Sequence, residues 1–576
     1  MSKFGSDLVV DLMAAYGLRY VAMNPGASYR GLHDSLVNWR ADAPEMVICT
    51  NEKIAVAMAH GYARVTGQPM GAIVHDVVGL MQATMGVFTA YLDQAPVMVF
   101  GGTGPMAVGK RRPHIEWAHT AFAQGDLVRN FVKWDDQPFD HQGVVDGFAR
   151  GFQVATMEPC GPVYICYDLA LQEEPLDVEP PLVVHVNDPQ RQFPAEDAVL
   201  REIAEWLVAA QHPVIVAGRV GRHQDTAEAL SRLAQLLAVP VYDQEWRFNI
   251  PNTDSQHFLE QHVAAGADLV LALDVSDLYG ALTSGNGSSR SERRWLPDAG
   301  ARLVEIRLDL LEGNGWSPKF ERYQQVQRSV MANTALAVPR LVAIVEELLD
   351  PPATRRRIEA RRAVITASHD ADRARYREQA RADWDASPVS TARLASELYA
   401  AVRHHDWVLS GSSLAGWTSR LWDLDDWHRF GGRSLGTATQ IGIGMGVALA
   451  HRGGDKLVVH IEPDGDLMFD PGVLWTIAHQ HLPMLIVMYN NRAYYNDWEH
   501  QAIVARQRGR DVARAHIGMD LHSPAPDFAS LARSFGMQGM GPIERPADLA
   551  DSLARAARIV VEERVPVLVD VITQHR

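Results

Sequence analysis

Two polar clusters within residues 458–491 have the residue types and the spacing of a site for a metal ion. Asp464-Gly465-Asp466 follows one apolar run, and Asn490-Asn491 follows the next. If a helix joins two parallel strands here, both strands end at the same edge of the sheet, where α/β folds bind ligands. Carboxylate and amide oxygens suit magnesium or calcium. The alternative is an ordinary strand end followed by a turn, because Asp-Gly turns are common.

Glu52 is a second candidate for chemistry, at the start of a helix predicted over residues 52–67. Gly67 is the expected C-terminal cap of that helix. A glutamate in the first turn usually does no more than stabilise the helix dipole. A buried carboxyl group beside an apolar ligand would instead have a raised pKa and suit proton exchange. The position of Glu52 alone does not separate these two interpretations.

Together the motifs resemble those of the thiamine diphosphate-dependent enzymes related to acetolactate synthase, benzoylformate decarboxylase and pyruvate decarboxylase. In that superfamily the cofactor motif Gly-Asp-Gly is followed by Asn-Asn. A glutamate there precedes the pattern Ala-x-x-Ala-x-Gly-Tyr-Ala-Arg-x-x-Gly, whose tail is matched closely by residues 57–67. The resemblance covers essentially the whole chain. Pro463 departs from it, because it replaces the first glycine and cannot donate a backbone N–H to a diphosphate.

This resemblance implies a site for thiamine diphosphate and Mg²⁺. It implies that Glu52 bonds the aminopyrimidine ring of the cofactor and exchanges a proton with it. Leu435, in the glycine-rich stretch 431–450, would support the bent cofactor from beneath, although a core leucine would fit the same position. The other contacts fall on the C-terminal third: Asp464, the Asn491 side chain and the Ala493 carbonyl for Mg²⁺, and Gly465, Asp466, Ser412 and Ser413 for the diphosphate.

Further residues are candidates for contacts with a substrate. Asn24 belongs to an Asn-Pro-Gly turn like that of benzoylformate decarboxylase relatives, and His75 ends a predicted strand where those relatives carry an active-site histidine. His119 and His114 lie where relatives place a side chain that faces the cofactor. Asp497 matches an acidic catalytic residue of pyruvate decarboxylases. A histidine at a strand end can relay a proton, but each of these residues also has a purely structural interpretation.

Three successive α/β units must position these residues. Short apolar runs alternate with helical patterns along the chain, which is typical of parallel sheets flanked by helices. We therefore predict an α/β chain of three consecutive domains, each a mostly parallel sheet flanked by helices. By the resemblance they are a pyrimidine-binding domain over residues 1–180, a central domain over 190–350 and a diphosphate-binding domain over 387–576, with a charged helical linker over 351–386.

Composition limits the classes of function. The 576 residues are 47% hydrophobic and 22% charged, as in globular proteins with large cores. A net charge of −16 argues against nucleic acid as a partner, and three cysteines without a C-x-x-C pair argue against a disulfide framework. The sequence shows neither a signal-peptide pattern nor an apolar run long enough to span a bilayer. We expect a cytoplasmic protein that does not bind membranes.

The expected activity is decarboxylation of a 2-oxo acid, followed by release of an aldehyde or by ligation to a second carbonyl compound. An acetolactate synthase-type ligase, or a C–C lyase acting on a hydroxyketone or a 2-hydroxyacyl-CoA, is the alternative within the superfamily. Pro463 suggests a third hypothesis, a catalytically silent subunit that binds the cofactor.

Two questions beyond the reaction stay open in the sequence. A dinucleotide-binding dehydrogenase module over residues 212–310 is a weak alternative, because its AGRVGR lacks the pattern Gly-x-Gly-x-x-Gly. FAD or ADP in the central domain is left open. The resemblance also implies a homodimer or homotetramer, in which Glu52 of one chain and Asp464 of another complete each site.

Overall fold

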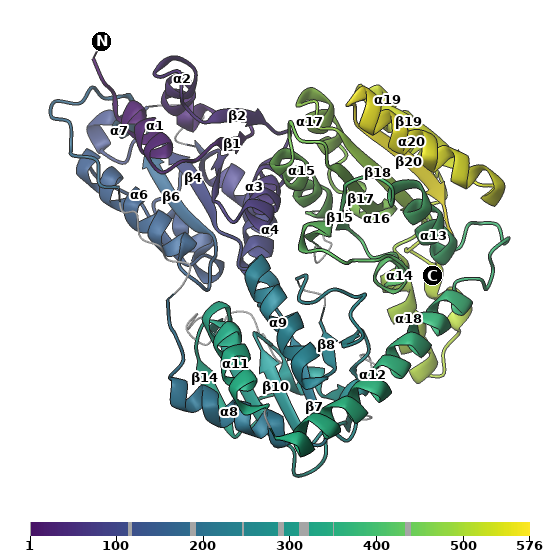
Figure 1. Cartoon of the computed structure of the whole chain (residues 1–576). Coiled ribbons are helices and arrows are strands. Elements are labelled where there is room, and N and C mark those ends of the chain that lie inside the picture. Colours follow the sequence, from purple (N-terminus) through teal and green to yellow (C-terminus); the bar gives the residue numbers. More distant parts are fainter. Residues whose placement is uncertain are drawn as a thin grey trace.

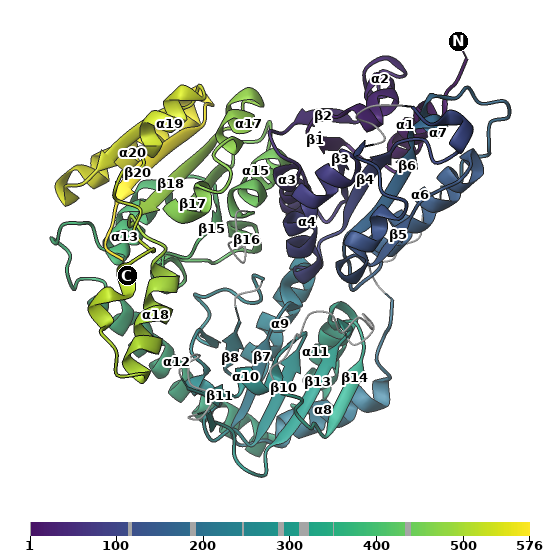
Figure 2. The same cartoon turned by 180° about the vertical axis from the view of Figure 1, so that it is seen from behind.

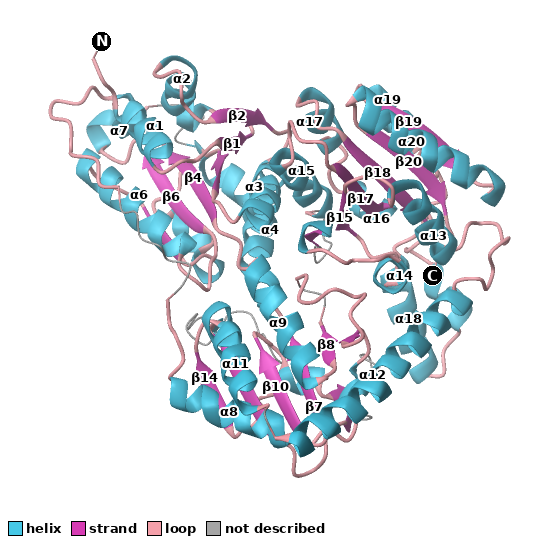
Figure 3. Cartoon of the chain, viewed as in Figure 1, coloured by secondary structure: helices cyan, strands magenta, loops and turns pink. Residues whose placement is uncertain are grey.

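The chain folds into three consecutive α/β domains, each built on a six-stranded parallel sheet (Figure 1). The computed structural model describes residues 2–112, 118–184, 192–244, 247–285, 293–309, 322–349, 351–432 and 439–575. Helices flank the sheet in each domain (Figure 3). The predicted fold class is confirmed, whereas the predicted domain boundaries stay predictions. Among the described residues, none of the helices combines the length and the apolar character needed to cross a bilayer.

The N-terminal sheet has the strand order β2-β1-β3-β4-β6-β5. Its central strands are buried along their whole length, which explains why they appear in the sequence as continuous apolar runs. The elements of this domain are β1 (Tyr20–Met23), β2 (Glu45–Ile48), β3 (Met70–Val74), β4 (Val97–Thr103), β5 (Trp134–Asp136) and β6 (Val163–Asp168), with helices α1 (Gly5–Ala15), α2 (Arg30–Asn38), α3 (Glu52–Thr66), α4 (Asp76–Leu92), α6 (His141–Thr156) and α7 (Leu169–Glu173).

The central sheet has the strand order β14-β13-β10-β7-β8-β9 and is also parallel. Two short antiparallel strands, β11 (Thr283–Ser284) and β12 (Arg294–Trp295), pair separately from it. The other elements here are β7 (Pro213–Ala217), β8 (Val241–Asp243), β9 (His257–Phe258), β10 (Leu269–Leu273), β13 (Arg302–Arg307) and β14 (Arg328–Met331), with helices α8 (Asp197–Ala209), α9 (Gln224–Leu237), α10 (Leu278–Ala281) and α11 (Thr334–Leu348).

The C-terminal sheet has the strand order β16-β15-β17-β18-β20-β19. Strands β17 and β18 are parallel neighbours, as predicted for residues 458–491, and Pro463 pairs in register with Tyr489. The elements are β15 (Trp407–Gly411), β16 (Phe430–Gly432), β17 (Leu457–Pro463), β18 (Met484–Asn490), β19 (Gln538–Ile543) and β20 (Val567–Ile572), with helices α13 (Thr391–Val402), α14 (Trp417–Leu421), α15 (Gln440–Ala450), α16 (Asp464–Leu467), α17 (Val473–His479), α18 (Tyr495–Gln507), α19 (Phe528–Ser534) and α20 (Leu549–Glu563).

Helices α3 and α15 lie side by side where the N-terminal and C-terminal domains meet (Figures 1 and 2). Glycines permit this close approach. A Cβ atom at Gly61 would lie 2.0 Å from the carbonyl oxygen of Ile443, and one at Gly446 would lie 2.1 Å from the carbonyl oxygen of Met58. The packing of these helices therefore requires glycine in both of them, including the one with the Gly-Tyr-Ala-Arg motif.

Helix α3 begins and ends as its sequence predicts. The Asn51 side chain accepts a hydrogen bond of 2.8 Å from the backbone N–H of Lys53, which caps the N-terminus beside Glu52. Gly67 ends the helix with a φ of 68°, a left-handed conformation that favours glycine. The N-terminal cap therefore makes Glu52 the first residue of the helix, directly after Asn51.

One long helix, α12 (Pro352–Gln379), runs from the central domain towards the C-terminal domain (Figure 1). One of its arginines binds backbone groups of the central domain. Arg361 donates hydrogen bonds to the carbonyl oxygens of Leu237 and Ala238, where α9 ends. The charged stretch thus connects two domains and satisfies carbonyl groups at a helix C-terminus.

Candidate active site

A cavity of about 560 Å³ lies at the carboxyl edge of the C-terminal sheet. The turns after β15, β17 and β18 form its walls together with the start of α18 and the end of the chain. Parallel strands bring these turns to one edge although they are far apart in sequence. The described lining residues are Thr391, Ser412, Ser413, Ala415, Gln440, Pro463, Asp464, Gly465, Asp466, Phe469, Tyr489, Asn491, Ala493, Tyr494, Tyr495, Asn496, Asp497 and His575.

Asp464 and Asn491 meet in this cavity around a single backbone group. The N–H of Ala493 lies 3.2 Å from Oδ2 of Asp464 and 3.0 Å from Oδ1 of Asn491, so it donates to both oxygens. Arg492 has a φ of 55°, and this left-handed residue turns the chain back towards the sheet edge. The predicted convergence is therefore present, and it places two hard oxygen ligands side by side.

The pKa and the burial of Asp464 indicate whether a cation would fit in this cavity. Burial raises the pKa of this carboxyl group to about 7, although backbone N–H groups of Gly465 and Ala493 act in the opposite direction. Only 2% of the residue is exposed. A divalent cation beside the carboxylate would offset the cost of burying its charge. The donor set of carboxylate, amide and backbone oxygens suits Mg²⁺.

Pro463 fits the strand without disturbing the turn that follows. It is the last residue of β17, with φ −76° and ψ 149°. The short helix α16 starts directly after it, and Tyr494 packs over Gly465 so closely that a Cβ there would lie 2.7 Å from the tyrosine ring. The helix predicted between β17 and β18 is broken into α16 and α17, and Pro471 lies between them.

Ser412 and Ser413 lie in a strained turn after β15. Leu414, Ala415 and Gly416 have successive φ values of 50°, 56° and 88°. Left-handed conformations in residues other than glycine are uncommon and concentrate at functional sites. The turn closes on itself, because the N–H of Gly416 donates a 3.0 Å hydrogen bond to Oγ of Ser413. It brings both serines to the cavity wall, as predicted.

The other candidate residues form a second cluster, at the carboxyl edge of the N-terminal sheet. A Cβ atom at Gly79, in the first turn of α4, would lie 2.8 Å from Oε1 of Glu52 and 3.2 Å from Cβ of His75. Glu52 is 5% exposed. The Asn-Pro-Gly turn lies against the same histidine, since a Cβ at Gly26 would lie 2.6 Å from His75. Asn24 accepts a hydrogen bond from Tyr29 through its backbone oxygen.

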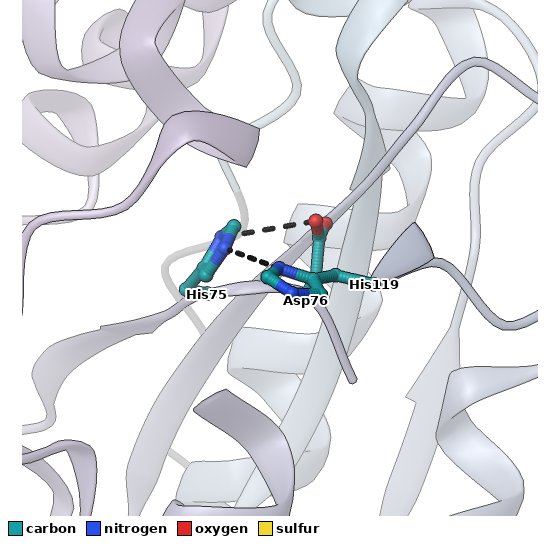
Figure 4. A group of neighbouring side chains, drawn as sticks. All are labelled: His75, Asp76 and His119. Carbon is teal, nitrogen blue, oxygen red and sulfur yellow. Dashed lines mark hydrogen bonds and ion pairs between the residues drawn. The ribbon is translucent and has the colours of Figure 1, made fainter. Parts of the chain in front are cut away.

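His75 is the centre of this cluster (Figure 4). Its Nδ1 lies 2.9 Å from Oγ of Ser28, and its Nε2 lies 3.3 Å from Nδ1 of His119. The Asp76 carboxylate lies 3.7 Å from Nδ1. Burial lowers the pKa of His75, and the neighbouring imidazole of His119 lowers it further, so the ring is neutral at neutral pH.

In one chain the two clusters do not line the same described cavity, and we call them the C-terminal half-site, around Asp464, and the N-terminal half-site, around His75. Every described residue that lines the C-terminal cavity lies at position 391 or later, so Glu52 and His75 are not among them. Lys53 forms an ion pair with Asp470 and so attaches the start of α3 to the C-terminal domain. Leu435 and His114 lie outside the described residues, and Asp497 is an exposed residue at the cavity. All assigned roles stay predictions.

The sequence did not predict two residues of these clusters, one in each half-site. Ser28 is fully buried against His75, four positions after Asn24, and its place beside the Asn-Pro-Gly turn is the signal that would have identified it. His575, three residues after β20, stacks on Tyr495 with ring centroids 4.6 Å apart and lines the cavity. Nothing in the sequence near residue 575 indicates a site.

A buried chain of Ser410, His460 and Glu462 lies close to the cavity. Oγ of Ser410 is 2.9 Å from Nδ1 of His460, whose Nε2 is 2.8 Å from Oε2 of Glu462. Burial lowers the pKa of His460 to about 3 and raises that of Glu462 well above its usual range, so both are neutral. Ser410 is only 1% exposed, which excludes it as a nucleophile. These hydrogen bonds join β15 to β17 just before the turns that line the cavity.

Charged side chains lie at the carboxyl edge of the central sheet. Arg222 forms ion pairs of 3.1 Å with Glu158 from the N-terminal domain and with Asp274. Asn333 donates a 2.6 Å hydrogen bond to Glu158. These contacts hold the central domain against the N-terminal one. FAD or ADP at this edge stays a hypothesis.

Comparison with known proteins identifies both half-sites with domains of one family. Residues 4–122 match the N-terminal TPP binding domain of thiamine pyrophosphate enzymes. Residues 412–571 match the C-terminal TPP binding domain of the same enzymes. The first match contains Asn24, Glu52 and His75, and the second contains Asp464 and Asn491.

Individual relatives cover nearly the whole chain at low identity. A protein of Pseudomonas aeruginosa described as "Probable 2-ketoarginine decarboxylase AruI" is 25% identical, over 96% of this chain and 90% of its own. A probable acetolactate synthase large subunit of Methanocaldococcus jannaschii is 22% identical, over 99% and 91%. The crystal structure of benzoylformate decarboxylase from Polynucleobacter necessarius shares the fold, with a TM-score of 0.76 and 18% identity over 100% of this chain and 99% of that one.

Proposed function

We propose that this chain, which belongs to the thiamine pyrophosphate enzymes, decarboxylates a 2-oxo acid and releases an aldehyde. In this reaction the bond between the carbonyl carbon and the carboxylate breaks, CO₂ leaves, and a proton takes its place on the carbonyl carbon. The observation that carries the proposal is the histidine pair beside Glu52, because release of an aldehyde requires a proton donor at the carbonyl carbon.

The C-terminal half-site would hold the cofactor. Asp464, Asn491 and the backbone oxygen of Ala493 would bind Mg²⁺, and the turns at Gly465 and Ser412 would face the diphosphate. Bound thiamine diphosphate would supply an electron sink for the electron pair released when the carboxylate leaves. Support comes from the shared donor at Ala493, the buried carboxyl group of Asp464 and the cavity beside them.

The N-terminal half-site would move protons. The Glu52 carboxyl group would hold a proton at one oxygen and exchange it with the aminopyrimidine ring. His75 keeps a fixed orientation through Ser28, so its Nε2 can pass a proton to or from Nδ1 of His119. A neutral imidazole with both nitrogens engaged is suited to such a relay.

A site completed by two chains follows from the separation of the half-sites. Glu52 and Asp464 must face one cofactor, yet the described lining of the C-terminal cavity includes no N-terminal residue. We therefore propose a homodimer, or a tetramer of two such dimers, in which two identical sites lie across a two-fold interface.

Two alternatives to this decarboxylation remain to be tested, a ligation and the absence of turnover. Acetolactate synthase catalyses ligation, and a relative of that name covers this chain about as fully as the decarboxylase does. The replacement of the first motif glycine by Pro463 is the reason to test for a subunit that binds cofactor without turnover. The chain stands at similar distance from both kinds of relative, so the products must decide.

Mass spectrometry of the products tests the proposed reaction. The protein is incubated with thiamine diphosphate, Mg²⁺ and a panel of 2-oxo acids with aliphatic, aromatic and guanidino side chains. We expect CO₂ and the matching aldehyde from at least one of them. Acetolactate from pyruvate as the main product would make the chain a ligase, and bound cofactor with no turnover on any 2-oxo acid would make it a silent subunit.

A further inference from the structure

We propose that His75, Asp76 and His119 form a binding site for one transition-metal ion of the Zn²⁺ or Co²⁺ type. One nitrogen of each histidine and one oxygen of the aspartate lie within 4.8 Å of one another. Figure 4 shows His75 facing both the Asp76 carboxylate and the His119 ring. Among the described residues, this is the one group of three or more His, Cys, Asp and Glu side chains with such spacing.

The two histidines are spaced as they would be around a bound ion. Zn²⁺ binds nitrogen and oxygen ligands at about 2.0–2.2 Å, so two ligands in a tetrahedral site lie roughly 3.4 Å apart. Nε2 of His75 and Nδ1 of His119 are already 3.3 Å apart. One oxygen of the Asp76 carboxylate lies within 4.8 Å of one nitrogen of each histidine and would have to move closer to bind the same ion. The site would have three protein ligands and leave the fourth position to water.

The ligand types select a transition metal over Mg²⁺. Imidazole nitrogen suits Zn²⁺, Co²⁺, Ni²⁺ and Cu²⁺, whereas Mg²⁺ requires oxygen ligands. The C-terminal half-site has the opposite composition, because Asp464 and Asn491 offer only oxygen. The chain would therefore hold two metal sites of different chemistry.

Neighbouring groups orient the ligands, as they do in protein metal sites. Ser28 engages Nδ1 of His75 at 2.9 Å and so directs Nε2 towards His119. The same hydroxyl lies 3.2 Å from the backbone N–H of Asp76, which acts as donor. The carbonyl oxygen of His119 accepts a 3.2 Å hydrogen bond from the N–H of Val77, which fixes His119 beside the start of α4.

An ion at this position would occupy the N-terminal half-site beside Glu52. It would hold both nitrogens of the histidine relay and block the approach of a substrate. Metal binding itself does not depend on the proposed function, but this inhibition rests on it. The two are tested separately, by a spectrum and by turnover.

The test is a titration of the metal-free, cofactor-free protein with Co²⁺, followed through its visible absorption. We expect one Co²⁺ per chain with the strong bands of a four-coordinate site, displaced by Zn²⁺ and not by Mg²⁺. His119→Asn should abolish the bands, and Ser28→Ala should weaken Co²⁺ binding by roughly tenfold. Asp464→Ala and the exposed control His500→Asn should bind Co²⁺ as the parent does. Circular dichroism confirms that each variant is folded.

The outcomes separate the site from its consequence. Weak octahedral bands in the parent, or parent-like bands in folded His119→Asn, would overturn the metal site. If the site is confirmed and the protein decarboxylates a 2-oxo acid, Zn²⁺ should inhibit turnover of the holoenzyme at the concentrations that displace Co²⁺. Zn²⁺ binding without inhibition would leave the site in place and show that His75 and His119 do not serve the reaction.

Discussion

Glu52 and Asp464 are two buried acidic residues in different surroundings. Both carboxyl groups are nearly inaccessible to solvent, at 5% and 2% exposure. Asp464 lies with Asn491 around one N–H donor, and we propose it as a ligand of Mg²⁺. Glu52 lies beside a neutral histidine, and we propose it for proton transfer. Two residues of similar acidity in water thus have different surroundings, and each proposed role predicts a different response to substitution.

Replacing a proposed metal ligand should remove the cofactor. We expect Asp464→Ala and Asn491→Ala to weaken the Mg²⁺-dependent binding of thiamine diphosphate by roughly 100-fold or more, because each removes an oxygen from the ion that joins diphosphate to protein. Isothermal titration calorimetry measures this. Asn496→Ala is the matched control, since Asn496 lines the same cavity but is not a proposed ligand. Parent-like affinity in either ligand variant would show that the metal lies elsewhere.

Replacing Glu52 should separate binding from chemistry. Glu52→Gln keeps the size of the side chain but cannot exchange a proton with the cofactor. We expect nearly unchanged calorimetric affinity for thiamine diphosphate, and turnover lower by about 10²–10⁴-fold. Glu45→Gln, at an exposed position in the same domain, should leave turnover unchanged. If Glu52→Gln turned over as the parent does, Glu52 would have no part in the proton transfer.

Parallel strands and tight turns position the residues of the proposed site. Strands β15, β17 and β18 end at one edge, and the left-handed turn after β15 presents Ser412 and Ser413 there. Gly416 ends that turn with a φ of 88°. Gly453 has a similar φ of 83° but does not line the cavity, and a Cβ atom there would meet no described neighbour within 4 Å. Substitutions at Gly416 and Gly453 therefore distinguish the loss of stability caused by a positive φ from any effect on cofactor binding.

Gly416→Ala and Gly453→Ala should each lower the stability of the fold by about 1 kcal/mol, because alanine resists a positive φ. Thermal melts measure this shared cost. Only Gly416→Ala should also weaken the binding of thiamine diphosphate, since it distorts the turn that we propose to face the diphosphate. Equal cofactor affinity in both variants would show that the Ser412 turn does not contact the cofactor.

Much of this architecture could be predicted from the sequence, and particular residues show where prediction stopped. Strands buried on both faces appear in the sequence as apolar runs. The βαβ pattern of these runs predicted that β17 and β18 end at the same edge, where Asp464 and Asn491 lie close together. The bond between Ser28 and His75 joins residues 47 positions apart through an irregular turn, which periodicity does not describe. The break at Pro471 and the position of His575 depend on packing between distant segments.

At the scale of the whole molecule, buried charges hold the domains in place. Glu158 of the N-terminal domain contacts Arg222 and His223 of the central domain, at 3.1 and 2.9 Å. Burial disfavours the charged carboxylate, but these cationic and hydrogen-bonding partners outweigh it and lower the pKa of Glu158 to about 2. Because the folded pKa is below the unfolded one, the stabilisation is present above about pH 4.5 and is lost as the pH falls towards 2.

Glu158→Gln should therefore reduce both the stability and its dependence on acid. The shift from the ordinary pKa of 4.5 corresponds to about 3 kcal/mol, and removing one partner of a buried pair costs a similar amount. We expect a lower melting temperature near pH 7, and a difference between parent and variant that shrinks between about pH 4.5 and pH 3. A difference that is constant over this range would show that folding does not lower the pKa of Glu158.

We propose that each active site combines half-sites of two chains. Mixing differently tagged Glu52→Gln and Asp464→Ala proteins, both inactive, under conditions that exchange subunits gives dimers with one intact and one doubly defective site. Native mass spectrometry counts the mixed dimers. Full statistical exchange should restore roughly a quarter of the parental activity, because half of the dimers are mixed and each has one working site. No recovery of activity despite demonstrated exchange would place Glu52 and Asp464 of each site in one chain and contradict the account.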